Sequence, residues 1–132
     1  MVKLIKTTGK RKRAVARAVL RPGKGVVKIN NNLMDLYQPD MARLKLQEPL
    51  ILAGDVAKTV DVSINVFGGG YMAQAEAARL ALAKALVKHT KRLEKPFSDY
   101  DRHLLVADVR RKETRKPNTH GKARSKRQKS YR

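Results

Sequence analysis

The last 23 residues constrain the fold most, because they cannot contribute to a hydrophobic core. Residues 110–132 hold eleven lysines or arginines against a single acid, Glu113, which leaves this segment a net charge of +10. Their only apolar side chains are Ala123 and the ring of Tyr131. Ordering one residue costs roughly 1–2 kcal/mol of backbone entropy, and burial offsets none of it here. We therefore expect a globular domain in residues 1–109 and an extended basic tail in residues 110–132 that stays disordered until a partner binds it.

The whole chain is also strongly basic. It has 31 lysines and arginines and 11 acids among 132 residues, a net charge of +20, and this length suits one domain. Such an excess favours a polyanionic partner, either nucleic acid or an anionic membrane. No apolar run approaches the ~18 residues of a membrane span, and residues 1–13 lack the apolar stretch of a signal peptide, so we expect no membrane partner. The absence of cysteine excludes disulfides and thiolate sites and suits a cytoplasmic protein.

Two segments alternate with the period of a half-buried strand. Residues 14–21 place three alanines and a leucine on one face, and residues 59–67 do the same with three valines and an isoleucine. The turn-forming sequence RPGKG lies between the first segment and another apolar run, residues 26–30. Residues 14–21 and 26–30 are therefore predicted to pair as a hairpin.

Helical spacing follows the strands. Residues 40–48 and 49–53 predict two short helices separated by a proline and ended by a glycine. A last helix is expected where Ser98 precedes an aspartate by three residues, a capping pattern. Residues 71–89 predict a long, alanine-rich helix that packs closely on the sheet. Its predicted apolar stripe consists of Tyr71, Ala75, Ala78, Leu82 and Leu86.

Three consecutive glycines, Gly68, Gly69 and Gly70, separate the strand predicted for residues 59–67 from the long helix. Main-chain N–H groups at a strand-to-helix turn bind anions, and three glycines suggest close approach of a ligand such as a phosphate. The spacing satisfies G-x-G-x-x-A, but residues 88–91 offer no ribose-binding acid and no G-K-[ST] follows, so we predict no nucleotide cofactor. A plain tight turn is the alternative interpretation.

No group of residues predicts catalysis or metal binding. In the sequence DYDRH, Asp99 and His103 share a helical face and Asp101 does not, so we interpret the acids as favourable charges near a helix start. No Ser/His/Asp grouping or glutamate pair is present. We expect a protein that is not an enzyme and has no metal, cofactor or small-molecule substrate.

The basic runs predict RNA binding. Arginine gives bidentate phosphate contacts and lysine gives point charges, and their mixture with serine, threonine and asparagine suits irregular folded RNA. No helix-turn-helix, zinc finger or basic zipper is recognisable. Besides the three glycines, the candidate RNA-binding residues are Lys10, Arg11, Lys12, Arg13, Arg110, Arg111, Lys112, Arg115, Lys116, Lys122, Arg124, Lys126 and Arg127.

Six stretches of the sequence together match the pattern of one protein family. They are GKRKRAVARA from Gly9, RPGKGVVKIN from Arg21, EPL from Glu48, VFGGGYMAQAEAARLALAKAL from Val66, DVRRKETRKP from Asp108, and the ending SKRQKSYR. On these residues the chain resembles the S-nine family of small-subunit ribosomal proteins over essentially its full length. The ending SYR and the stretch DYDRHLLVADVRRKE from Asp99 resemble its archaeal and eukaryotic branch.

The resemblance implies a fold, partners and further site residues. It implies an α+β fold, a two-layer α/β sandwich with a mixed sheet and a left-handed β-α-β crossover, the S-five domain-two-like fold. It also implies that the RNA is rRNA of the small-subunit head, and that neighbouring head proteins are partners. The tail would extend toward the anticodon stem-loop of peptidyl-site tRNA, which makes Lys129, Ser130, Tyr131 and Arg132 the candidate tRNA-binding residues.

Two other classes of function remain open at this stage. One is a free RNA- or DNA-binding protein, which would bind many nucleic acids without a unique site. The other is a nucleotide-dependent enzyme built on the glycine turn, which would bind a mononucleotide.

Overall fold

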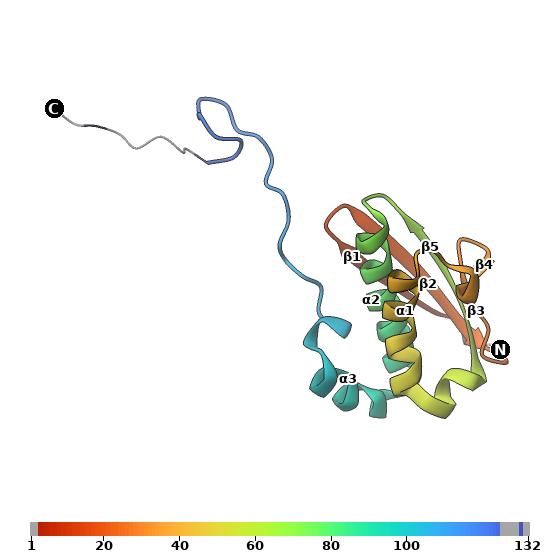
Figure 1. Ribbon diagram of the computed structural model, residues 1–132. Coiled ribbons are helices and arrows are strands. Elements are labelled where there is room, and N and C mark those ends of the chain that lie inside the picture. Colours follow the sequence, from red (N-terminus) through yellow and green to blue (C-terminus); the bar gives the residue numbers. More distant parts are fainter. Residues whose placement is uncertain (1–2, 125–129, 131–132) are drawn as a thin grey trace.

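A mixed sheet covered on one face by helices forms the domain. The computed structural model describes residues 3–124 and residue 130. The strand order is β1-β2-β5-β3-β4, and only β3 and β5 are parallel (Figure 1). The expected α+β architecture with a mixed sheet is confirmed. The strands are β1 Ile5–Arg11, β2 Ala14–Pro22, β3 Val27–Ile29, β4 Asn32–Leu33 and β5 Val60–Phe67.

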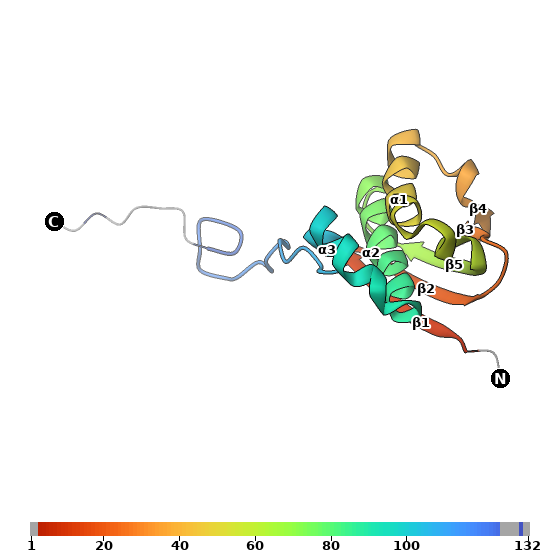
Figure 2. The same ribbon diagram turned by 90° about the horizontal axis from the view of Figure 1, so that it is seen from below.

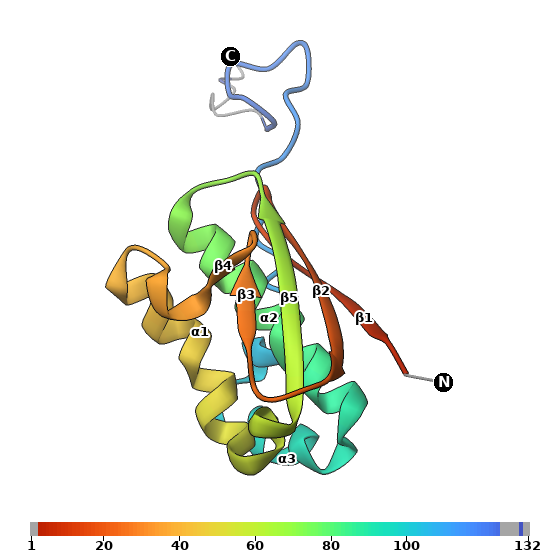
Figure 3. The same ribbon diagram turned by 90° about the vertical axis from the view of Figure 1, so that its right-hand side faces the viewer.

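The helices lie behind the sheet when the strands face the viewer (Figure 3). In that view β3 and β5 both rise, β5 lies to the right of β3, and their connection passes through α1 behind the sheet. This arrangement is the left-handed crossover that the family resemblance implied. The α-helices are α1 Asp40–Ala53, α2 Tyr71–His89 and α3 Glu94–Tyr100, and the 3-10 turns are Met34–Leu36, Gly54–Thr59, Lys91–Leu93 and Arg102–Leu104.

The predicted hairpin of residues 14–21 with residues 26–30 is wrong. β2 pairs instead with β1 on one side and with β5 on the other, and β3 lies beyond β5. The partner strand β1 precedes β2 through a tight turn in which Lys12 has φ 53°. Alternation in β1 was overlooked within a basic run, although Ile5, Thr7 and Gly9 face inward. The alternating burial predicted for β2 and β5 is confirmed.

The backbones of β1 and α2 approach each other unusually closely. A Cβ built on Gly9 would lie 2.1 Å from the carbonyl oxygen of Ala77. The buried hydroxyl of Thr7 donates a hydrogen bond of 2.7 Å to the carbonyl oxygen of Ala81. Small side chains at this contact let the helix lie almost directly on the strand, as the alanine content predicted.

The long helix buries more than the predicted stripe. Tyr71 is 62% exposed, so it does not belong to the core, whereas the other four residues of that stripe are buried. Burial extends around α2 because the sheet covers one side and α1 covers another (Figure 2), while the 3-10 turns on either side of α3 also contact it. The buried residues are Ala75, Ala77, Ala78, Leu80, Ala81, Leu82, Ala83, Ala85 and Leu86.

The prediction of two helices separated by Pro49 is wrong. α1 runs unbroken from Asp40 to Ala53 and ends at Gly54, which has φ 58°. An interior proline costs about 3 kcal/mol in helix propensity, but Pro49 is buried in line with other core residues. Packing on that stripe outweighs the local preference. The stripe is Ala42, Leu46, Pro49 and Ala53.

The last helix begins earlier than the capping pattern indicated. α3 starts at Glu94, with Pro96 in its first turn, so Ser98 lies inside the helix and caps nothing. The cap in this region is Asp101, whose side chain accepts a 2.9 Å hydrogen bond from the N–H of His103 at the start of the next 3-10 turn. Phe97 of α3 and Leu104 of this 3-10 turn are fully buried and hold the two elements against the domain.

Candidate nucleic-acid interface

Three segments that are distant in sequence line one groove of about 1060 Å³. They are the β1–β2 turn at Lys12 and Arg13, the glycine turn with the start of α2, and residues 110–115. Figure 3 shows the chain leaving the domain past the turn that joins β5 to α2. Among the residues that line the groove, only Glu113 is acidic. The fold therefore gathers the candidate residues from both ends of the sequence into one basic concavity.

The glycine turn has two different sides. Gly68 and Gly69 have φ of 74° and 66°, and Cβ atoms there would lie 2.7 Å from the carbonyl oxygen of Arg13 and 3.0 Å from the backbone nitrogen of Ala14. The close approach at these two glycines is thus made by the protein's own β1–β2 turn. Gly70 differs, because no heavy atom would lie within 4 Å of its Cβ. Only Gly70 leaves open space on the groove side.

The start of α2 presents main-chain donors to this groove. Gly70 precedes the helix as its N-cap and offers no side chain to cap it. The first N–H groups of a helix have no intrahelical partner, and the helix dipole adds partial positive charge there. Ala73, in the first turn, lines the groove beside Gly69 and Gly70. Donors and dipole at this position suit an anionic ligand such as a phosphate.

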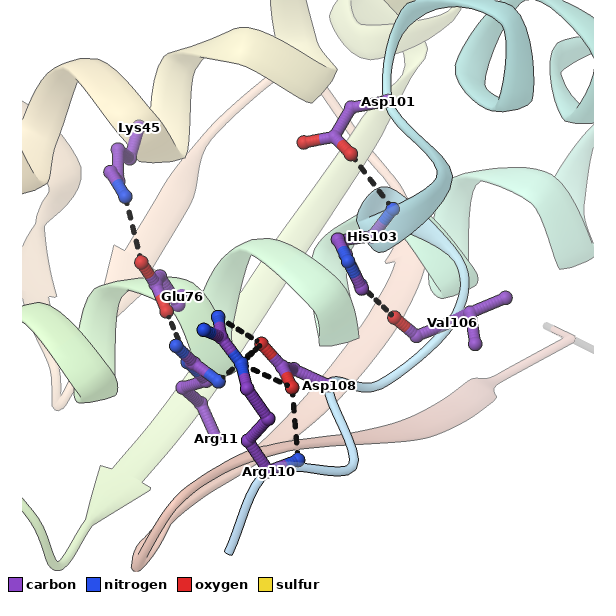
Figure 4. A network of polar contacts seen from close by, with 8 residues as sticks. All are labelled: Arg11, Lys45, Glu76, Asp101, His103, Val106, Asp108 and Arg110. Atoms are coloured by element: carbon purple, nitrogen blue, oxygen red, sulfur yellow. Dashed lines mark hydrogen bonds and ion pairs between the residues drawn. The ribbon is translucent and has the colours of Figure 1, made fainter.

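A network of charges fixes the root of the tail to the domain (Figure 4). Arg11 from β1 lies between Glu76 of α2, at 2.6 Å, and Asp108, at 2.5 Å. Asp108 also accepts a 2.7 Å contact from Nη2 of Arg110 and a hydrogen bond from its N–H. Lys45 of α1 completes the network at 2.7 Å from Glu76. The tail therefore leaves the domain from a defined point next to the groove.

The acids of this network are held in their charged form. Hydrogen bonds from the Arg110 side chain and N–H, with the charge of Arg11, hold the pKa of Asp108 well below its usual range. Burial opposes ionisation of Glu76, but hydrogen bonds from Lys45 and Arg11 outweigh it and lower its pKa. Both carboxylates are thus committed to positioning cations rather than to proton transfer.

A turn interrupts the tail, which was expected to be extended throughout. The guanidinium of Arg124 pairs with Glu113 at 2.6 Å, and the N–H of Lys116 donates to the carbonyl oxygen of Lys122 at 3.0 Å. Asn118 has φ 63° within this turn. No helix or strand occurs between residues 105 and 124, and the backbone of this segment runs away from the domain (Figure 1).

The predicted RNA-binding residues differ in whether an acid of the chain already forms an ion pair with them. Arg11, Arg110 and Arg124 are paired with acids of the chain. Lys126, Arg127, Lys129, Tyr131 and Arg132 lie outside the described residues, and Ser130 is exposed. Within residues 3–124, the candidate cations that form no ion pair are Lys10, Lys12, Arg13, Arg111, Lys112, Arg115, Lys116 and Lys122.

The interpretation of the DYDRH acids as charges near a helix start holds for Asp101 alone, because Asp99 lies in the last turn of α3, which ends at Tyr100. Asp101 caps the turn at His103 and lies 3.1 Å from Arg79, which also pairs with Glu48. Burial opposes ionisation of Asp101, yet the N–H of His103 and the charge of Arg79 lower its pKa. No group of three metal-ligating side chains occurs among the described residues. Residues 88–89 end α2, so no strand carries an acid where a dinucleotide site needs one.

Sequence reasoning missed the acids that organise this site. Glu76 and Asp108 appeared as ordinary charges, because their partners Arg11 and Lys45 lie 31 to 97 positions away. It also missed Arg17, whose guanidinium lies 5.6 Å from the ring centroid of Phe67 on the neighbouring strand. A strand prediction for residues 5–11 would have revealed that Arg11 ends a strand beside α2.

Comparison with known proteins identifies close relatives. The family model described as ribosomal protein S9/S16 matches residues 9–132. A protein of Desulfurococcus amylolyticus named small ribosomal subunit protein uS9 is 47% identical over 133 residues, covering 99% of this chain and 94% of the relative. A protein of Pyrobaculum aerophilum with the same name is 48% identical over 132 residues, covering 98% and 92%. In the part of the chain that the structure describes, none of the helices combines the length and apolarity needed to cross a bilayer.

Proposed function

Because the chain belongs to the ribosomal protein S9/S16 family, we propose that it is a structural protein of the small ribosomal subunit that binds rRNA of the subunit head. A member of this family has a structural role in translation rather than an enzymatic one, and it works in the cytoplasm as part of the ribosome. The proposal extends to the residues that make the contacts, which are those of the basic groove and the tail.

The groove is the observation that carries the proposal. Eleven residues from three distant segments line it, and its cations at Lys12, Arg13, Arg111, Lys112 and Arg115 have no acidic partner among the described residues. Like charges that are gathered on one surface repel each other unless a polyanion neutralises them. RNA phosphates along the groove would do so, with the open N–H groups near Gly70 as an additional phosphate site.

The tail would carry the second contact. In the sequence, Lys129, Ser130, Tyr131 and Arg132 follow the groove residues 110–115 and the turn of residues 116–122. In our proposal these four residues reach peptidyl-site tRNA, where Tyr131 stacks on or hydrogen-bonds to the RNA and Arg132 binds a phosphate. The family resemblance supports this assignment, and so does the length of chain that follows the anchor at Asp108.

Sedimentation with ribosomal subunits tests the proposal as a whole. Tagged full-length protein should sediment with the small subunit in sucrose gradients at high salt and leave no free pool at the top. A free RNA- or DNA-binding protein would instead detach as salt rises, because non-specific phosphate contacts weaken steeply with ionic strength. Sedimentation only at low salt would contradict the ribosomal assignment.

Gly70→Val tests the phosphate site without disturbing the fold. Its φ of −91° suits any residue, and its Cβ would meet no heavy atom within 4 Å. We expect unchanged thermal unfolding and weaker rRNA binding. Gly69→Val is a poorer test, since φ 66° and a contact of 3.0 Å strain the turn itself. Unchanged rRNA affinity in a folded Gly70→Val protein would mean that the glycine turn has only a structural role and binds no phosphate.

Deletion of residues 129–132 tests the tip of the tail. The groove and its cations remain, so the truncated protein should still enter the subunit. Stacking and phosphate contacts contribute roughly 1–3 kcal/mol per base in single-strand binders, so tRNA should dissociate from the peptidyl site several-fold faster. The off-rate is measured on purified subunits that carry either chain. An off-rate equal to that of the full-length chain would remove the tRNA contact from the proposal.

A further inference from the structure

Helix α1 carries a second apolar stripe that faces away from the domain. Its buried stripe runs through Leu46 and Pro49, whereas Met41, Leu44 and Ile51 are 65%, 54% and 75% exposed. Positions 41, 44 and 51 recur at helical spacing, and at 100° per residue they lie roughly opposite the buried stripe. A helix that only covered a core would be polar on its outer side. The outer side of α1 is therefore apolar beyond what folding requires.

The apolar surface continues onto the segment before α1. Leu33 and Leu36, from β4 and the adjoining 3-10 turn, are 46% and 70% exposed. A hydrogen bond of 3.0 Å from Nη1 of Arg43 to the carbonyl oxygen of Asp35 ties this turn to the helix. Figure 2 shows α1 and β4 together on the side of the domain away from β1. We call the set of Leu33, Leu36, Met41, Leu44 and Ile51 the α1 surface.

Its charge is opposite to that of the rest of the molecule. Residues 29–57 contain two basic and four acidic residues, a net charge of −2 in a chain of +20. Both cations are already engaged, Arg43 with Asp40 at 2.9 Å and Lys45 with Glu76 at 2.7 Å. No cation of this segment is left to neutralise a phosphate, and the adjoining Lys58 pairs with Asp55 at 3.2 Å, so the α1 surface is poorly suited to RNA.

We propose that the α1 surface docks on a neighbouring protein of the small subunit. This inference rests on the proposed function and names the surface that the protein neighbour uses. The matching surface would have an apolar centre and a rim of lysine or arginine, because the exposed Asp35 forms no ion pair with a described residue, and Asp40 and Asp55, 70% and 96% accessible, pair only with cations of the chain itself. Interfaces of this kind combine an apolar core with a charged, hydrated rim.

Two other occupants fit the same surface less well. A second copy of this chain would bring two acidic rims together, and like charges facing each other across an interface disfavour it. RNA would need cations that this side lacks. Exposed apolar side chains of this size on one face of a small protein mark an interaction site rather than random exposure. A basic protein neighbour satisfies both the apolar centre and the acidic rim.

Site-specific crosslinking in assembled subunits tests the inference. A photo-crosslinking amino acid is placed at position 44 or 51 of the full-length chain, and at position 111 as a control in the groove. After purification of small subunits at high salt and irradiation, positions 44 and 51 should each link to one stoichiometric subunit protein. Position 111 should link to rRNA. Links from 44 and 51 to rRNA, to a second copy of the chain, or to nothing would each overturn the inference.

The control separates this inference from the proposed function. If position 111 links to rRNA while positions 44 and 51 link to no protein, the α1 surface is wrong and the ribosomal role stands. If the chain does not sediment with small subunits, the proposed function fails and the docking inference fails with it.

A competition experiment measures what the surface contributes. Leu44→Gln with Ile51→Gln removes the apolar centre at positions that are already exposed, so the protein should fold. Mixed with wild type during reconstitution, the double variant should occupy roughly tenfold fewer subunits, because each buried leucine or isoleucine contributes to the interface. Leu4→Gln is the matched control, an exposed leucine (56%) next to lysines at the far edge of the sheet. Equal occupancy by the double variant and the control would refute the docking role.

Discussion

Two regions along α2, its buried face and the groove at its N-terminus, both depend on glycine but for opposite reasons. Gly9 leaves no room for a side chain, since a Cβ would lie 2.1 Å from the carbonyl oxygen of Ala77. Gly70 has open space on its Cβ side. The first glycine lets two backbones pack together, and the second leaves N–H groups accessible. The same residue type thus marks a packing contact in one place and a proposed binding surface in another.

Gly9→Ala should cause the largest loss of stability, because it acts on the packed region. The added methyl cannot be accommodated unless β1 and α2 separate, and overpacking of a rigid core costs about 3 kcal/mol. Urea unfolding followed by circular dichroism measures the change. Gly70→Ala is the matched control and should change the free energy of unfolding by less than about 0.5 kcal/mol. Equal losses for the two variants would show that the difference between these regions is not real.

Removal of positive charge from the groove should weaken rRNA binding and leave stability unchanged, the reverse of the effect of Gly9→Ala. Lys12→Gln with Arg13→Gln should leave unfolding unchanged, because neither side chain forms an ion pair with another described residue. Binding to a head rRNA fragment should weaken roughly tenfold, which is about 1.4 kcal/mol, and the salt dependence should lose about two counterions. Lys88→Gln with Lys91→Gln, at the other end of α2, keeps the same net charge and serves as control. A loss of affinity as large in the control would mean that charge alone, not the groove, sets affinity.

Thr7→Val sharpens the packed side of the comparison with a smaller change. The substitution keeps the shape of the side chain and removes the 2.7 Å hydrogen bond to the carbonyl oxygen of Ala81. We expect a loss of about 1 kcal/mol in the free energy of unfolding, with rRNA affinity unchanged. Thr8→Val, whose side chain is exposed on the same strand, provides the reference. A neutral effect of Thr7→Val would show that close backbone packing, not this hydrogen bond, holds the helix on the strand.

Low pH should weaken the ion pairs of Asp108 and Glu76 at the root of the tail. We expect the resulting loss of stability to be the smallest of these effects. The pKa values of Asp108 and Glu76 are lowered in the folded chain, so their contribution is present above their unfolded values and is lost as pH falls through the folded ones. Stability should therefore fall as pH decreases below about 4. Asp108→Asn should flatten part of that dependence in pH-dependent unfolding curves. An unaltered pH dependence in this variant would mean that Asp108 does not anchor the tail root.

Local patterns predicted some elements well and others badly, and the reason is the range of the interactions involved. Alternation in residues 14–21 and 59–67 reported directly which side chains are buried, because each strand has one face on the core. Pro49 misled the helix prediction, because tertiary burial on one stripe outweighs its local cost. The hairpin prediction failed because β5, from later in the chain, pairs with β2 and separates it from β3.

The candidate site was predictable in its residue types but not in its arrangement. The basic runs, the glycine turn and the tail are visible as sequence features. That Gly68 and Gly69 serve the β1–β2 turn, and that Arg11 anchors the tail root, depended on contacts between distant segments. The assignment of Lys129, Tyr131 and Arg132 to tRNA stays a prediction, since these residues lie outside the described part of the chain.

The inward faces of β2 and β5, part of the buried face of α2, the absence of cysteine chemistry and the concentration of positive charge in the last 23 residues could all be read from the sequence alone. These properties are local, because side-chain periodicity and charge are set by neighbouring residues. The strand order, the convergence of two basic segments and the glycine turn on one groove, and the set of unpaired cations depended on the tertiary structure. Arg11 and Glu76 are 65 positions apart, and nothing in the local sequence of either specifies a partner at that range. Their pairing follows from where the packed core places β1 against α2.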